Sequence, residues 1–258
     1  MTARATVAKL SIAPVKSTSL HHPDEIRLER WGVPGNREFL FVNDRGRLFS
    51  GSRFGPLVAV RARYDADADR LTLALPDGSV ADGPVRLSDE PISVDVWGRE
   101  VPAREVVGPW AGAVSRFAGQ PVRLLKPDRP GDGNDGSAAS IVSTASIEEL
   151  TQRSGRPEAR DGRRFRMLVE VAGVEPHEED TWVGREVALG GAVVRVTRPN
   201  PRCVVTTQSP DTGVKDLDTL REIRGYRGTI PDGGIPFGVY ADVVEPGRVR
   251  VGDPAGLR

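Results

Sequence analysis

The sequence predicts a mostly β protein with a few helices, an α+β fold built from two β-rich, barrel-like modules. Three observations predict this class. Short runs of alternating apolar and polar residues recur along the chain and end in turn residues. Only a few segments have the spacing of an amphipathic helix. A segment rich in Pro, Gly and Asp lies near the middle of the 258 residues and separates the two modules.

The first predicted strands form a hairpin over residues 39–50. Its turn contains Asn43, Asp44 and Gly46, which tolerate the positive φ of tight turns. Apolar and polar residues also alternate in the other predicted strands. Most of these strands adjoin a predicted turn, and the last two lie late in the chain. These other strands cover residues 71–75, 92–96, 193–196, 237–244 and 249–251.

Three helices are predicted. The first covers 109–118, with Pro109 in its first turn and Gly119 as its stop. The second covers about 146–153, because Ser146 and Glu149 have the spacing of a capping box. The third covers about 217–224, where leucines recur on one face.

The segment 126–137, KPDRPGDGNDGS, has almost nothing to bury. We interpret it as a linker or a long functional loop. The predicted domains are therefore residues 1–125 and 126–258.

Composition excludes several classes of function. The 36 basic and 36 acidic residues balance, so no uniform nucleic-acid-binding face is expected. No apolar run is long enough to span a bilayer, so no membrane partner is expected. One cysteine excludes an intrachain disulfide and fits a cytoplasmic location. The three histidines are too scattered for a zinc site.

The most informative motif is RPNPRCVVTTQSPDTG, residues 198–213, which holds the cysteine, Cys203. Pro199 and Pro201 restrict the backbone before it, and the following residues resemble the start of a strand. Arg198 and Arg202, if close to Cys203 in space, would favour the thiolate, the form that attacks or binds metal. The alternative is a buried, unreactive cysteine at a strand edge.

Three basic motifs are candidates for binding an anion. Lys16 and Ser17 follow a predicted strand, and Arg37 precedes the first hairpin. Arg163, Arg164 and Arg166 precede the apolar run MLVEV. Solvated loop lysines, ordinary ion pairs and basic protection of a strand edge are the respective alternatives.

The chain resembles the MOSC family in its two-part form with an N-terminal β-barrel domain. The resemblance runs from about residue 7 to 256 and is most specific in RCVVTTQSPDTG, LREIRGYRG and IPFGVYADVVEPGRVRVGDP. It implies an N-terminal β-barrel domain followed by a MOSC β-barrel domain. Similar proteins include the mitochondrial amidoxime-reducing components, bacterial reductases of N-hydroxylated compounds, and the ends of molybdenum cofactor sulfurases. At the family level only, it also carries an association with pyridoxal phosphate.

The resemblance implies a role for individual residues. Cys203 matches the cysteine that ligates the molybdenum of a molybdopterin cofactor. The residues that match cofactor-binding positions are Lys16, Ser17, Arg37, Gly136, Ser137, Arg166 and Arg202. The chain departs from relatives at Asn200, where a second cysteine is frequent, and at Met167 and Leu168, which replace Pro and Asn. It departs again at residues 50–53, where SGSR replaces TARQ.

The predicted function is therefore that of a molybdenum-dependent reductase of N-hydroxylated or N-oxygenated small molecules. Because no cluster cysteines or GxGxxG loop are present, electrons must come from a separate flavoprotein, ferredoxin or cytochrome b5-like protein. The alternatives are a cofactor carrier or sulfur-transfer protein, a nucleophilic enzyme pairing Cys203 with His177, and a structural domain without cofactor.

Overall fold

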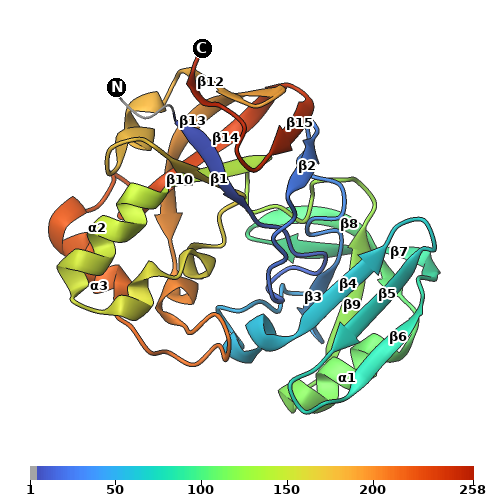
Figure 1. The fold of residues 1–258 in the computed structure, drawn as a ribbon. Coiled ribbons are helices and arrows are strands. Elements are labelled where there is room, and N and C mark those ends of the chain that lie inside the picture. Colours follow the sequence, from blue (N-terminus) through green and yellow to red (C-terminus); the bar gives the residue numbers. More distant parts are fainter. Residues whose placement is uncertain (1–4) are drawn as a thin grey trace.

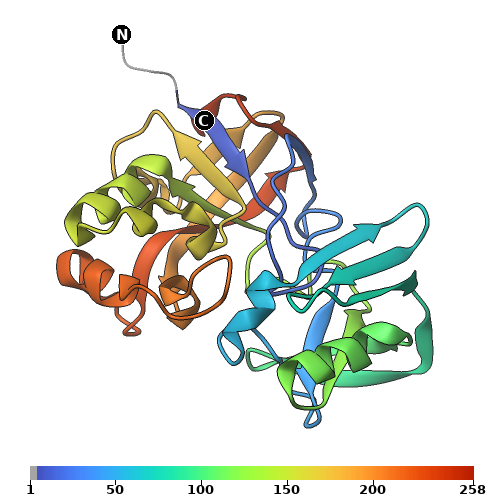
Figure 2. The same cartoon turned by 60° about the horizontal axis from the view of Figure 1, so that its bottom comes forward.

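The computed structural model describes residues 5–258 and consists mainly of strands, with three α-helices and five short 3₁₀ helices in that range. Two bodies lie side by side, each with its own sheets and at least one α-helix (Figures 1 and 2). The predicted mostly β, α+β class is confirmed.

The larger body is a nearly closed barrel of seven strands. In sheet order, these are β1 (Thr6–Leu10), β11 (Val169–Ala172), β10 (Ala139–Ser143), β14 (Ile235–Glu245), β13 (Ala192–Arg202), β12 (Glu186–Leu189) and β16 (Ala255–Leu257). The amide of Ala255 donates to the carbonyl of Ala5 at 2.9 Å, so the first and last strands meet. Closure leaves an apolar interior that includes Leu10, Val169 and Val194, each with no exposed surface.

Two N-terminal strands belong to the larger body, one in the barrel sheet and one in a separate two-stranded sheet that packs on the same core. Strand β1 pairs antiparallel with β11, and β2 (Glu25–Leu28) pairs with β15 (Gly247–Arg250). The chain therefore begins in the larger body, crosses to the smaller one and returns. The boundary near residue 126 stays a prediction.

The smaller body contains two sheets and one helix. The first sheet has the order β3 (Leu40–Asn43), β9 (Val122–Pro127), β8 (Arg99–Val106), β7 (Leu87–Val96), and the second has the order β4 (Arg61–Asp65), β5 (Arg70–Ala74), β6 (Val80–Pro84). Helix α1 (Pro109–Ala118) has the predicted bounds and ends at Gly119 in the left-handed region. It buries Trp110 completely, and the indole donates to the carbonyl of Leu71.

The predicted hairpin over 39–50 is present in shortened form. The amide of Phe49 donates to the carbonyl of Phe41 at 2.7 Å, and Asn43 and Gly46 form the turn. However, β3 forms its regular ladder with β9.

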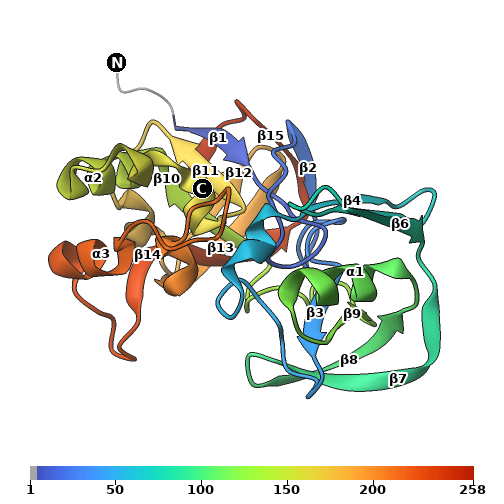
Figure 3. The same ribbon diagram turned by 90° about the horizontal axis from the view of Figure 1, so that it is seen from below.

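Helices α2 (Thr144–Ser154) and α3 (Thr219–Arg227) lie together at one end of the larger body (Figure 3). The predicted start of α2 was two residues late. The side chain of Ser143, not Ser146, caps the helix by accepting the amide of Ser146 at 2.9 Å. The hydroxyl of Ser146 instead donates to buried Glu179.

The predicted strand after Cys203 was wrong. Residues 204–207 form the 3₁₀ helix η5 (Val204–Thr207), so Cys203 follows a strand instead of preceding one. The hydroxyls of Thr206 and Thr207 donate to the carbonyls three residues earlier, which favours a turn over an extended chain.

The arginine cluster also does not lead directly into a strand. It lies in η3 (Gly162–Phe165), and Arg166 ends that helix at a φ of 50°. The remaining 3₁₀ helices are η1 (Gly55–Ala59), η2 (Pro157–Arg160) and η4 (Glu178–Trp182). None of the helices within residues 5–258 is long and apolar enough to cross a membrane.

Candidate functional site

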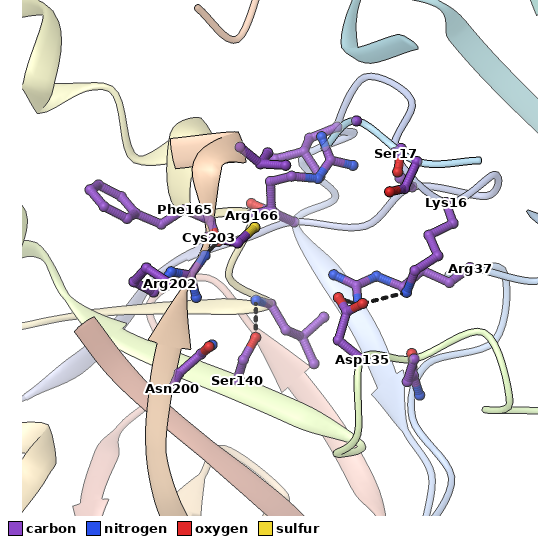
Figure 4. A pocket seen from close by; sticks show the side chains of 18 of the residues that line it. Lys16, Ser17, Arg37, Asp135, Ser140, Phe165, Arg166, Asn200, Arg202 and Cys203 are labelled. Atoms are coloured by element: carbon purple, nitrogen blue, oxygen red, sulfur yellow. Dashed lines mark hydrogen bonds and ion pairs between the residues drawn. The ribbon is translucent and has the colours of Figure 1, made fainter. Parts of the chain in front are cut away.

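A pocket lies between the two bodies and receives side chains from both (Figure 4). Seven of the eight sequence-predicted site residues line it. These are Lys16, Ser17, Arg37, Ser137, Arg166, Arg202 and Cys203. They come from five separate stretches of sequence, and only the tertiary fold brings them together.

Cys203 is exposed and stands at the end of the long strand β13. In Figure 4 its sulfur lies beside the side chain of Arg166, and Arg202 lies to the left of it. The alternative of a sealed, unreactive cysteine is therefore wrong. No group of three or more His, Cys, Asp or Glu residues suited to a metal was found within residues 5–258. The protein thus offers one soft ligand rather than a complete metal site.

Arg166 and Arg202 bring positive charge to the thiol without a carboxylate partner in the described chain. Arg166 Nη2 donates to the carbonyl of Thr18 at 2.7 Å, whereas its buried Nη1 has no partner among residues 5–258. Loss of solvent and the nearby charge of Arg37 lower the pKa of Arg166 to about 10. Arg202 Nη2 donates to the carbonyl of Phe165, and no described residue is a partner for its buried Nε. Loss of solvent also lowers the pKa of Arg202.

The opposite side of the pocket holds Lys16 and Arg37 around Asp135 (Figure 4). Lys16 Nζ lies 2.6 Å from Asp135 Oδ1 and 2.7 Å from the carbonyl of Gly133, and Arg37 pairs with the other carboxylate oxygen. The indole of Trp97 donates to Asp135 Oδ1 at 3.0 Å. Burial lowers the pKa of Lys16 to about 8, although Asp135 opposes this shift.

Sequence reasoning missed Asp135, because it lies in the segment interpreted as a linker. Burial opposes its ionisation, but the charges of Arg37 and Lys16 outweigh burial and hold its pKa well below the usual range. The available signal was its position directly before Gly136 and Ser137, two residues already assigned to the cofactor. Trp97 was missed too; it occupies a two-residue hairpin turn with a φ of 57°.

Gly136 is not among the residues that line the pocket, although its neighbours Asp135 and Ser137 are. Its carbonyl accepts from Ser137 Oγ at 2.8 Å and from Arg198 Nη2 at 3.4 Å. Arg198, which the sequence suggested as a companion of the thiol, places its guanidinium over the ring of Tyr240, 4.4 Å from the ring centre. Of the two arginines beside the cysteine in sequence, Arg202 is the one that lines the pocket.

The other basic and histidine candidates point elsewhere. Arg163 pairs with Asp161 and Asp211, and buried Arg164 pairs with Asp216. The ring of His177 contacts Glu149, Tyr226 and Phe237, none of which lines the pocket. Its burial lowers the pKa of His177 to about 4. The geometry thus gives no support to a Cys203–His177 pair.

The residues present fit an anionic cofactor that brings its own metal. Arg166 and Arg202 line the pocket, and each has one buried nitrogen, Nη1 and Nε respectively, without an acceptor within residues 5–258. Unsatisfied buried donors are destabilising, and a bound oxyanion or carbonyl oxygen would satisfy them. The exposed sulfur of Cys203 stands beside them as a ligand for a soft metal.

The chain is similar in sequence to two family models and to several known proteins. The sequence matches the family model of the MOSC N-terminal beta barrel domain over residues 4–120 and that of the MOSC domain over residues 128–255. Mitochondrial amidoxime reducing component 2 of Macaca fascicularis is 30% identical, over 96% of this chain and 82% of that protein. Mitochondrial amidoxime-reducing component 1 of Mus musculus is 28% identical over 98% of this chain and 82% of that protein. A molybdenum cofactor sulfurase of Oryza sativa subsp. japonica is 24% identical over 91% of this chain but only 32% of its own length.

Proposed function

From the premise that this chain belongs to the MOSC family, with the family's N-terminal barrel domain, we propose that it binds a pterin-type molybdenum cofactor and reduces N-hydroxylated small molecules. The observation that carries the proposal is an exposed cysteine beside two arginines whose buried nitrogens have no partner in the described chain. The names of the relatives support both parts, the cofactor and the reduction of amidoximes.

Each pocket residue has a role in this proposal. Lys16, Ser17 and Arg37 hold the phosphate end of the cofactor, and the backbone at Gly136 and Ser137 borders it. Charge-assisted hydrogen bonds to an anion are stronger than neutral ones, so buried cations suit this task.

Residues on the other wall act nearer the metal. Arg166 and Arg202 neutralise negative charge, and Cys203 provides the protein thiolate. Arg166 is held in place by its hydrogen bond to Thr18, so a residue of the larger body is fixed by the N-terminal loop.

When bound, the cofactor supplies two-electron oxygen-atom transfer chemistry. In the net reaction the N–O bond of the substrate breaks, two electrons and two protons enter, and the products are the reduced nitrogen compound and water. The electrons come from a separate donor protein, a flavoprotein, a ferredoxin or a cytochrome b5-like protein, because one cysteine cannot hold an iron–sulfur cluster. We further propose that the reaction takes place in the cytoplasm.

A cofactor carrier or sulfur-transfer protein is the second candidate. Met167 and Leu168 favour it, since they stand where relatives of the reductase type have Pro and Asn. In that case Cys203 would hold the cofactor or a persulfide without turnover.

Metal and pterin analysis tests the proposal. We expect the wild-type chain, expressed in a host that makes the cofactor, to contain molybdenum and pterin, and Cys203→Ala to lose the metal while staying folded. Reduction of benzamidoxime by an artificial reductant would exclude a pure carrier. A wild-type protein that contains neither molybdenum nor pterin would refute the proposed function.

A further inference from the structure

Two unsatisfied polar atoms share one wall of the pocket. Asn200 Oδ1 and Arg202 Nε are both buried, and neither has a hydrogen-bond partner within residues 5–258. Asn200 is only 2% exposed, yet it lines the pocket. An acceptor and a donor left unpaired in this way each cost free energy until a ligand satisfies them.

The sulfur of Met167 fixes the direction of both groups. Asn200 Nδ2 lies 3.4 Å from Met167 Sδ, and Arg202 Nη1 lies 3.3 Å from the same atom. A thioether sulfur accepts but cannot donate, so the asparagine amide turns its nitrogen towards Met167 and its oxygen away. Both side chains therefore contact one sulfur atom and lie on the left side of Figure 4, and each contributes one further polar atom, an acceptor on Asn200 and a donor on Arg202.

We propose that Asn200 and Arg202 recognise the lactam edge of the cofactor's pterin ring, an inference that rests on the proposed function. A lactam carries a carbonyl next to an N–H in one plane. The carbonyl accepts from Arg202 Nε and the N–H donates to Asn200 Oδ1, which satisfies both orphaned atoms. Asn200 acts here as a specificity-determining residue, and its amide could not be replaced by an apolar side chain without losing the acceptor.

The proposal distinguishes two pteridines that differ only at this edge. Pterin-6-carboxylate has the lactam, whereas 2,4-diaminopteridine-6-carboxylate has an amino group and a bare ring nitrogen in its place. The second compound would set a donor against Arg202 and an acceptor against Asn200, so both contacts become repulsive. Because both probes carry the same carboxylate, their attraction to the basic pocket is the same.

The experiment measures binding of the two fluorescent probes to the full chain purified without cofactor. We expect wild-type protein to prefer pterin-6-carboxylate by at least tenfold. Asn200→Leu, which is close in volume, should reduce this preference below threefold by weakening pterin binding. Thr219→Val, a buried polar-to-apolar change outside the pocket, should leave the preference unchanged.

The ratio of the two affinities within one variant does not depend on the fraction of folded protein, so partial destabilisation cannot imitate the result. Any one of three outcomes would overturn the inference. The wild-type protein could fail to bind the pterin, it could bind the two probes equally, or Asn200→Leu could keep the wild-type preference. A clear preference in a protein that acquires no molybdenum would instead support the inference and refute the proposed reductase.

Discussion

Lys16 and Asp135 form an ion pair in which Nζ and Oδ1 lie 2.6 Å apart. The lysine is 5% exposed and the carboxylate 33% exposed. This pair joins the start of the chain to the segment that links β9 to β10, and Arg37 and Trp97 bind the same carboxylate. The positions of both cations therefore depend on one acidic residue.

Asp135→Asn tests that dependence. The amide oxygen can still accept a hydrogen bond, but the charge that compensates Lys16 and Arg37 is lost. We expect the free energy of unfolding in urea to fall by about 1–3 kcal/mol, since a buried charge is left uncompensated. Asp82→Asn, which breaks an exposed pair with Arg70, is the control and should have a smaller effect. Equal losses in the two variants would show that Asp135 is an ordinary surface partner.

The pKa of Lys16 predicts a pH dependence of anion binding. Burial lowers this pKa from 10.5 to about 8, so Lys16 loses its charge as the pH rises through 8. Sulfate, whose own charge is constant in this range, should bind roughly fivefold or more weakly at pH 9.5 than at pH 7. Titration calorimetry measures this, and Lys16→Met should bind weakly at both pH values. A wild-type affinity that does not change with pH would contradict the assignment.

The lowered pKa of Lys16 also makes the free energy of unfolding depend on pH. The folded state has the lower pKa, so between pH 8 and 10.5 it binds fewer protons than the unfolded state. The contribution of Lys16 to the free energy of unfolding therefore increases with pH across this window. Comparing urea denaturation of wild type and Lys16→Met at pH 8 and 10 isolates that contribution.

Contact between the two bodies depends on Gly213. This residue has a φ of 73°, and a Cβ atom there would lie 2.0 Å from the carbonyl oxygen of Gly55 in the smaller body. Gly213→Ala should lower the free energy of unfolding by about 3 kcal/mol or more, because backbone strain and a clash add. Gly252→Ala is the matched control, since Gly252 also has a positive φ but nothing within 4 Å of a Cβ. That control should lose only about 1–2 kcal/mol.

His177→Ala tests the rejected nucleophilic pair. The ring of His177 packs against Phe237 and bonds to Tyr226, away from the pocket lining. We expect the variant to lose about 1–3 kcal/mol of stability through lost packing. Its turnover of benzamidoxime per folded molecule should stay within about twofold of wild type. A much larger loss of kcat at unchanged KM would restore the pair as a candidate.

Local sequence patterns determined many of the strands and the bounds of one helix. Alternating apolar residues specified the strands of both bodies, and Pro109 and Gly119 set the ends of α1, because these signals act within a few residues. Cys203 and four of the basic residues singled out in the sequence line the pocket: Lys16, Arg37, Arg166 and Arg202. The helix η5 was missed because threonine hydroxyls compete locally with strand pairing.

Tertiary structure alone decided the rest. It placed β1 beside β11 and β2 beside β15, and it paired Arg163 and Arg164 with acids. Within residues 5–258 it left one nitrogen atom each of Arg166 and Arg202 without a partner. It also turned an apparent linker residue, Asp135, into the partner of two buried cations. The physical reason is that hydrogen bonding and electrostatic pairing depend on distance in space, and these partners lie up to 225 residues apart in sequence.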